Sequence, residues 1–259
     1  MLTWPHPGTD WRLLLEDADR VFAEIAREVA LRERVVVACH DPAHRDHVQD
    51  LLTTAGAEMS RVALYTAPSD DSWSRDHGPI TVFDHDQPVL LDFHFNGWGR
   101  KYPHERDNQI TRRLHQQGAF DGTELRGVDL VLEGGSIEVD GNGSLLTTTS
   151  CLLSPERNPE YDCIGLEGLF AELFGVKQVL WLEHGHLAGD DTDGHIDTLA
   201  RFCDAHTITY VRCDDPADEH FEPMAAMEAQ LRDFESADGR PYRLVPLPPP
   251  APQFDTDGR

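Results

Sequence analysis

The sequence has little positive charge and no long apolar run. Lysine and arginine number 22 against 47 aspartate and glutamate residues, which gives a formal net charge of −25. Such a surface repels nucleic acid and anionic membrane and attracts cations. No stretch approaches the roughly 18 apolar residues that a membrane-spanning helix needs. We therefore expect neither nucleic acid nor a membrane as a partner, and the charge permits a cationic ligand without showing one.

The cysteine pattern of a disulfide scaffold or a zinc knuckle is also missing. There are five cysteines, an odd number, and no CxxC pair, which favours a reducing compartment. The first residues, MLTWPHPGTDW, have neither the basic nor the apolar region of a signal peptide. We therefore predict a cytoplasmic protein. Its 259 residues could form one large domain or two small ones.

Helices and strands are predicted to alternate, without a long linker or a detectable repeat. This pattern is typical of an α/β fold with several strand–helix modules. In the first predicted helix, Leu14, Val21, Ile25 and Val29 share one face, as on an amphipathic helix that packs on a core. The helices are predicted over about 10–32, 43–55, 105–117, 164–174 and 217–236. The strands are predicted over 2–4, 34–41, 61–67, 80–84, 88–95, 128–135, the hairpin 136–149, 178–185, 206–213 and 242–247.

Residues 190–202, DDTDGHIDTLARF, place four acids and a histidine within eight residues. This cluster could hold a metal ion, a positively charged organic group, or only water. An EF-hand with Gly194 in sixth position would need an acid where Gly189 stands and a glutamate where Ala200 stands, so the calcium template fails. The sequence contains no HExxH, but a zinc hydrolase stays an alternative because three histidines are near, His184, His186 and His195.

Other polar motifs also follow predicted strands, where α/β folds build sites on loops. DSWSRDHGP carries Trp73 and Asp76, and LEGGS places Glu133 before two glycines that let another backbone approach closely. If residues 195–197 are extended, His195 and Asp197 point to the same face, which suits proton transfer beside a bound cation. Taken singly, each motif is explained equally well by a surface acid, a turn or a strand end.

Taken together, the motifs resemble the agmatine deiminase and Porphyromonas-type peptidyl-arginine deiminase family in order and spacing. The resemblance covers nearly the whole chain and runs through LTWPHPGTDW, DSWSRDHGPI, FNGWGRKYPHERDNQITRRL, LEGGSIEVDGNGSLLTTTSCLLSPERNP and GDDTDGHIDTLARF. It implies an α/β fold, the five-bladed α/β-propeller of ββαβ modules (pentein type). It also implies that residues 1–259 form a single deiminase domain, without the family's N-terminal lead-in and with the last module incomplete.

The resemblance implies hydrolysis of a guanidino group to a ureido group, with release of ammonia and without a metal or another cofactor. Asp76 and Asp197 are then the carboxylates that grip the guanidinium, and His195 is the general acid and base. Glu133 orients His195, and Trp73 forms a wall of the pocket. A guanidinium is planar with five N–H donors, so two carboxylates can each bind it in bidentate fashion.

The nucleophile of this family is a cysteine in a glycine-rich segment close to the C-terminus, whereas this chain ends after PAPQFDTDGR. We therefore expect the binding and acid/base groups to be present without the attacking thiol. Each of the five cysteines is expected to be a small buried hydrophobe. The leading function is conversion of agmatine to N-carbamoylputrescine in putrescine formation. The alternatives are a peptidyl-arginine deiminase, a non-catalytic guanidinium-binding protein and a metal hydrolase, and homo-oligomer formation is left open.

Overall fold

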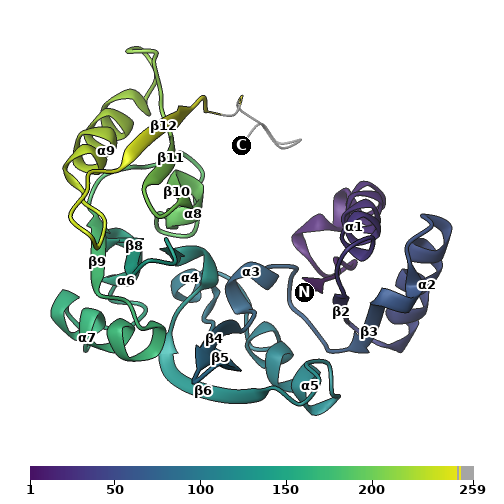
Figure 1. Ribbon diagram of the computed structural model, residues 1–259. Coiled ribbons are helices and arrows are strands. Elements are labelled where there is room, and N and C mark those ends of the chain that lie inside the picture. The colour runs from purple at the N-terminus through teal and green to yellow at the C-terminus, as the bar shows by residue number, and fades with distance from the viewer. Residues whose placement is uncertain (250, 252–259) are drawn as a thin grey trace. The chain divides into compact units, whose positions relative to one another are not determined.

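The computed structural model describes residues 1–249 and 251, so the end of the predicted domain 1–259 lies partly outside the described residues (Figure 1). The chain divides into two compact units, one ending at Gly134 and the other beginning at Gly135. Each unit holds two three-stranded sheets. Within the described residues, no helix is both long and apolar enough to cross a membrane.

The first sheet of the N-terminal unit is entirely parallel. It contains β1 (Leu2–Thr3), β2 (Val35–Cys39) and β3 (Val62–Thr66), joined by the 3-10 turns η1 (Asp10–Leu13) and η2 (Met59–Arg61) and the helices α1 (Leu15–Ala30) and α2 (Pro42–Thr54). Helix α2 starts at Asp41, whose carboxylate accepts the backbone N–H of His44, and proline occupies its first turn. Trp4 is fully buried in the core between helices and sheet.

Helix α1 turns a different side to the core from the predicted one. Its buried positions include Ala18, Ala23, Ala26 and Ala30. The large aliphatic residues expected in the core are between 39% and 57% exposed, namely Leu14, Val21, Ile25 and Val29. Alanines let the helix axis lie close to the sheet, where Trp4 already fills the space. The helix was predicted correctly, but the prediction of its core-facing side was wrong.

The second sheet of this unit combines a hairpin with a parallel strand. Strands β4 (Ile80–Asp84) and β5 (Gln87–His94) are antiparallel, and β6 (Glu124–Val131) is parallel to β5. The crossover contains η3 (Asp107–Gln109) and α5 (Ile110–Gln116). Two short helices flank the hairpin, α3 (Ser74–His77) before β4 and α4 (Gly97–Arg100) after β5. These two helices carry part of the candidate site.

The C-terminal unit repeats the same ββαβ order twice. In one sheet the hairpin consists of β7 (Ile137–Val139) and β8 (Ser144–Thr148), and the 3-10 turn η4 (Gly134–Ser136) precedes it. The chain then passes through α6 (Thr149–Leu152) and α7 (Cys163–Phe174) to β9 (Gln178–Leu182), which is parallel to β8. In the other, β10 (Ala200–Asp204) and β11 (Thr207–Val211) form the hairpin, and α9 (Phe221–Asp233) leads to β12 (Arg243–Leu247). Helix α8 (Ile196–Leu199) precedes β10.

The predicted α/β organisation is confirmed, since each predicted helix and strand overlaps an observed one, although the strand predicted over 128–135 is shifted to Glu124–Val131 (β6). Strand β10 and the four-residue helices were missed. The sequence of β10, ARFCD, is too short and too polar to show a period-2 pattern.

Candidate active site

The loop between β3 and α3 is held by buried carboxylates. Asp107 accepts the backbone N–H groups of Asp70 at 2.7 Å and Asp71 at 3.1 Å. Burial raises the pKa of Asp107 to about 7, although these two donors act in the opposite direction. The backbone that leads to Trp73 and Asp76 is therefore fixed by a residue from a distant part of the same unit.

Asp76 lies within α3, and Trp73 occupies the position just before this helix. The indole Nε1–H of Trp98 donates to Oδ2 of Asp76 at 3.0 Å. The ring of Trp98 also lies 4.4 Å from that of Trp73, between centroids. Trp98 thus contacts both predicted residues of this loop, and sequence reasoning missed it, although it stands in the quoted FNGWGRKY motif.

Glu133 follows β6 and is fully buried. At the next residue, Gly134, an added Cβ would lie less than 3.0 Å from the carbonyl oxygen of Arg75 in α3. This is the close backbone approach that the glycine pair predicts. The structure therefore brings the Glu133 segment against the helical turn of Asp76, within one unit.

In the C-terminal unit, the acidic loop before α8 is held largely by its own side chains. Asp190 accepts the backbone N–H of Thr192 through Oδ1 at 3.0 Å and that of Gly194 through Oδ2 at 2.6 Å. The hydroxyl of Thr192 in turn accepts the backbone N–H of His195 at 3.0 Å. These bonds form a compact loop whose last link holds the backbone of His195.

Arg157 anchors this loop from outside. Its side chain is fully buried, and Nη1 pairs with Oδ2 of Asp193 at 2.7 Å. Its Nη2 donates to the carbonyl oxygen of Thr192 at 2.9 Å. The fork geometry of a guanidinium serves both acceptors at once. Sequence reasoning missed Arg157, and the only signal for it was its place in the quoted SPERNP segment.

The segment of His195 and Asp197 is not extended, which corrects the geometric argument made from the sequence. His195 occupies the position before α8, and Asp197 lies in the first turn of that helix. Asp190 and Asp193 constrain the loop here, so a helix begins where a strand end was expected. The imidazole is 2% exposed and Asp197 is half-buried. Of the predicted residues, Trp73, Asp76 and Glu133 belong to the N-terminal unit, and His195 and Asp197 belong to the C-terminal unit.

The three histidines named in the zinc alternative are placed differently. His184 and His186 are exposed, whereas His195 is buried. Over residues 1–249 and 251, the ring nitrogens of these three histidines do not gather within the distance that a shared ion needs. The acids of the loop are engaged with backbone groups and with Arg157 instead.

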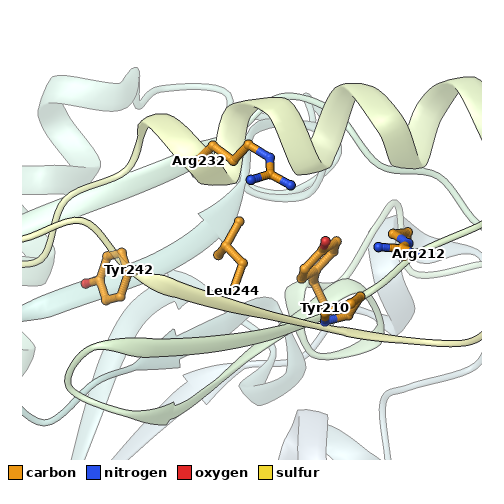
Figure 2. A pocket seen from close by; sticks show the side chains of 6 residues that line it. Tyr210, Arg212, Arg232, Tyr242 and Leu244 are labelled. Carbon is orange, nitrogen blue, oxygen red and sulfur yellow. The ribbon is translucent and has the colours of Figure 1, made fainter.

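A pocket of about 320 Å³ lies between α9 and β12 (Figure 2). None of the predicted site residues lines it. Its two arginines are paired, Arg212 with Asp214 at 2.8 Å and Arg232 with Glu228. The hydroxyl of Tyr242 donates to Ser144 at 3.0 Å. These polar groups around the pocket therefore already have partners within the C-terminal unit.

None of the five cysteines, all of which lie in the described residues, forms a disulfide bond, and their surroundings differ. Cys39, Cys151 and Cys213 are buried as expected, but Cys203 is exposed and Cys163 is partly exposed, which corrects that expectation. Burial raises the pKa of Cys39 to about 12 and also raises that of Cys163. The thiol of Cys151 lies within 4.8 Å of a ring nitrogen of His195.

The fold is that of an α/β protein built from strand–helix modules. The predicted site residues that can bear a charge are carboxylates and one imidazole, which suit binding of an organic cation. A model of the Porphyromonas-type peptidyl-arginine deiminase family matches residues 1–259, and the chain belongs to that family. The resemblance seen in the sequence is thereby confirmed, and the chain is homologous to agmatine deiminases, which hydrolyse guanidino groups.

Individual relatives support this placement. An agmatine deiminase of Stutzerimonas stutzeri is 32% identical, over 99% of this chain and 69% of the relative. A structure of C. jejuni agmatine deiminase with substrate bound is 35% identical, with a TM-score of 0.88 over 100% of this chain and 73% of that one. A chain from Porphyromonas gingivalis is 47% identical, with a TM-score of 0.91 over 100% of this chain and 75% of that one.

Proposed function

We propose that this protein is of the agmatine deiminase type, the guanidino-group hydrolases that convert agmatine to N-carbamoylputrescine and ammonia, and that residues 1–259 supply the binding and acid/base groups of this reaction without its nucleophile. The observation that carries the proposal is that two acidic segments are anchored independently, each presenting a predicted carboxylate on a fixed turn. Trp98 fixes Asp76, and the loop anchored by Arg157 precedes His195 and Asp197. Fixed carboxylates bind a planar guanidinium without first having to order themselves.

In this proposal, Asp76 and Asp197 grip the guanidinium nitrogens of the substrate. Burial favours this interaction because a charge pair is stronger where water is excluded. His195 protonates the departing ammonia and then takes a proton from the attacking water. Glu133 orients the imidazole, and Trp73 forms a wall beside the substrate.

The covalent step requires a thiolate. Its sulfur forms a bond to the guanidinium carbon, the C–N bond breaks, and ammonia leaves with a proton from His195. Water then adds to the same carbon of the thiouronium intermediate, and the C–S bond breaks to release the ureido product and the thiol. We propose that none of the five cysteines is this nucleophile. Burial raises the pKa of Cys39 to about 12, and Cys163 is shifted in the same direction.

Cys151 is the strongest internal competitor for that role because its thiol lies near the ring of His195. It is fully buried behind the Thr148 turn, which caps its backbone N–H. A nucleophile has to reach the substrate carbon, which such a position opposes. We therefore expect no ammonia release from agmatine by residues 1–259 between pH 5 and 10. Turnover that Cys151→Ser abolishes would show that the internal thiol attacks.

We propose agmatine as the substrate because the relatives from Stutzerimonas stutzeri and C. jejuni are named agmatine deiminases. The net charge of −25 also favours a small cation. The description of the matched family supports the alternative, an arginine side chain in a peptide. We place the reaction in the cytoplasm, in keeping with five cysteines that form no disulfide bond in the described residues. The five-bladed propeller belongs to the same proposal and is supported by the ββαβ order of three sheets.

Calorimetric titration of the chain with agmatine, free arginine and an arginine-containing peptide tests the proposal. We expect agmatine to bind and the two arginine ligands to bind at least tenfold more weakly, a difference of about 1.4 kcal/mol. Preference for the peptide would favour the peptidyl-arginine alternative. Binding without ammonia release, in a protein extended by the family's cysteine segment, would support a non-catalytic guanidinium-binding protein. Absence of binding to all three would contradict the proposal.

A further inference from the structure

The short helix α4 is left-handed. Four consecutive residues have positive φ, Gly97 at 65°, Trp98 at 54°, Gly99 at 83° and Arg100 at 66°. The backbone N–H of Arg100 donates to the carbonyl of Asn96 at 2.8 Å, which closes a turn of the same length as in an α-helix. The side chain of Asn96 accepts the N–H of Gly99 at 2.8 Å and caps the turn. The turn is therefore a hydrogen-bonded unit.

Only two of the four residues in the turn of α4 are glycines, which suit this left-handed conformation. Glycine adopts positive φ without cost, and at Gly97 an added Cβ would also meet His104, at 3.1 Å from Nδ1. Residues with a Cβ are disfavoured there, bulky ones most strongly. Trp98 and Arg100 nevertheless stand in the turn. Strain of this kind persists where the side chain it positions has a function.

The left-handed turn directs the indole of Trp98 at Asp76. The ring packs against the other members of an aromatic cluster, Trp73 at 4.4 Å, Tyr102 at 5.5 Å and Phe95 at 6.2 Å between centroids. It is 8% exposed, so it has little room to rotate. Its single N–H donor then reaches Oδ2 of Asp76 at 3.0 Å. An indole has no other polar atom, so this bond alone fixes how the ring meets the carboxylate.

We propose that Trp98 is a positioning residue: held by the left-handed turn, its indole N–H fixes the plane of the Asp76 carboxylate for the guanidinium ligand. This rests on the proposed function, in which Asp76 grips the substrate. A carboxylate on a four-residue helix can rotate about two side-chain bonds. The bond from Trp98 to Oδ2 restricts that rotation. The carboxylate is thereby ordered before the ligand arrives.

The matched variants are Trp98→Phe and Trp4→Phe, both studied in the chain of residues 1–259. Trp4 is in the same unit, and its Nε1–H also donates to a carboxylate, Oδ1 of Asp19, at 2.7 Å. Both changes keep an aromatic ring and remove one indole–carboxylate bond. We expect Trp98→Phe to weaken agmatine binding in calorimetry about tenfold, or about 1.4 kcal/mol. We expect Trp4→Phe to bind agmatine as the unsubstituted chain does.

A second measurement needs neither binding nor a folded Trp98 variant. In the ¹⁵N-labelled chain, each tryptophan gives one indole N–H signal. We expect Asp76→Asn to shift the signal of Trp98 and to leave that of Trp4 in place. If the unsubstituted chain does not bind agmatine while the Trp98 signal shifts, the proposed function fails and the positioning contact stands. Unchanged affinity in Trp98→Phe, equal losses in both Phe variants, or an unmoved Trp98 signal would each overturn the inference.

Discussion

The two acidic segments of the molecule are held in place by different means. In the N-terminal unit, Asp76 depends on residues distant in sequence, Trp98 through a hydrogen bond and Gly134 through a close backbone approach. In the C-terminal unit, the loop before His195 is closed by its own Asp190 and is also held from outside, by Arg157 at Asp193 and by the hydroxyl of Thr148, which donates to the carbonyl of Gly194 at 2.7 Å. The position of Asp76 can therefore be disturbed from several distant segments, whereas the loop before His195 depends on its own bonds and, among its outside contacts, on the buried ion pair of Arg157.

The largest expected effect concerns ligand affinity in the C-terminal segment. Asp197→Asn removes one negative charge from a half-buried position that we assign to the guanidinium. Breaking a buried ion pair costs roughly 3–5 kcal/mol, so agmatine affinity should fall by about 200-fold or more in calorimetry. Asp191→Asn, an exposed acid of the same loop, is the matched control and should change affinity less than threefold. A loss below fivefold in Asp197→Asn would remove Asp197 from the clamp.

The anchor of the same loop can be tested through stability. Arg157→Met keeps the aliphatic part of the side chain and leaves Asp193 and the Thr192 carbonyl without this partner. We expect a loss of about 3 kcal/mol in the free energy of urea unfolding. The control is Arg20→Met, which breaks the exposed pair with Asp17 and should cost less than about 1 kcal/mol. Equal effects in the two variants would show that Arg157 is not an anchor.

The same contrast explains what the sequence could predict. Asp190 and Thr192 lie two residues apart, and such short-range bonds are signalled by local composition. Glycines before a close approach are also readable, as at Gly134. The contact of Trp98 with Asp76 spans 22 positions and depends on a left-handed turn that no spacing rule indicates. The roles of the site residues came from family resemblance, since each motif alone allowed a simpler explanation.

The errors of the sequence analysis have physical causes as well. For α1, amphipathicity located the helix but chose the wrong side, because small side chains can face the core when the sheet lies close. For His195 and Asp197, the assumption of an extended backbone failed because side-chain bonds within residues 190–194 constrain the preceding loop, and α8 begins directly after it. Periodicity therefore predicts elements better than it predicts which neighbour covers them.

The N-terminal segment should be sensitive to a single methyl group. In Gly134→Ala the new Cβ would overlap the carbonyl oxygen of Arg75, so α3 or the Glu133 segment has to move. Overpacking of this kind costs about 1–3 kcal/mol, and agmatine affinity should fall with it. Gly168→Ala is the matched control because its Cβ meets nothing within 4 Å and Gly168 lies in helix α7, where alanine stabilises by roughly 0.5–1 kcal/mol. Tolerance of Gly134→Ala would contradict the close approach.

Asp107 gives the N-terminal unit a pH dependence. Its pKa is about 7 when folded and has a reference value of 3.8, so between these values the folded chain keeps a proton that the unfolded chain loses. Stability then falls as pH rises through this window. Asp107→Asn cannot ionise and should be more stable than the unsubstituted chain at pH 8, by a few kcal/mol at about 1.4 kcal/mol per pKa unit, and similar at pH 4. His6 and His77, whose pKa values are lowered to about 4, oppose this trend equally in both proteins. Parallel pH profiles would show that Asp107 is not strongly shifted.

The smallest effect is expected when residues with positive φ in the two segments are replaced by glycine. Arg100 has φ 66° and an exposed side chain, so Arg100→Gly should relieve about 1–2 kcal/mol of left-handed strain. The greater freedom of glycine in the unfolded chain offsets roughly 0.5–1 kcal/mol of this gain. A net stabilisation of about 0.5 kcal/mol should appear in urea unfolding. Asp193, at φ 69°, has the same strain but pairs with buried Arg157, so Asp193→Gly should destabilise despite the same relief. If both glycines stabilised the chain, the C-terminal loop would not depend on its ion pair, and the difference between the two segments would disappear.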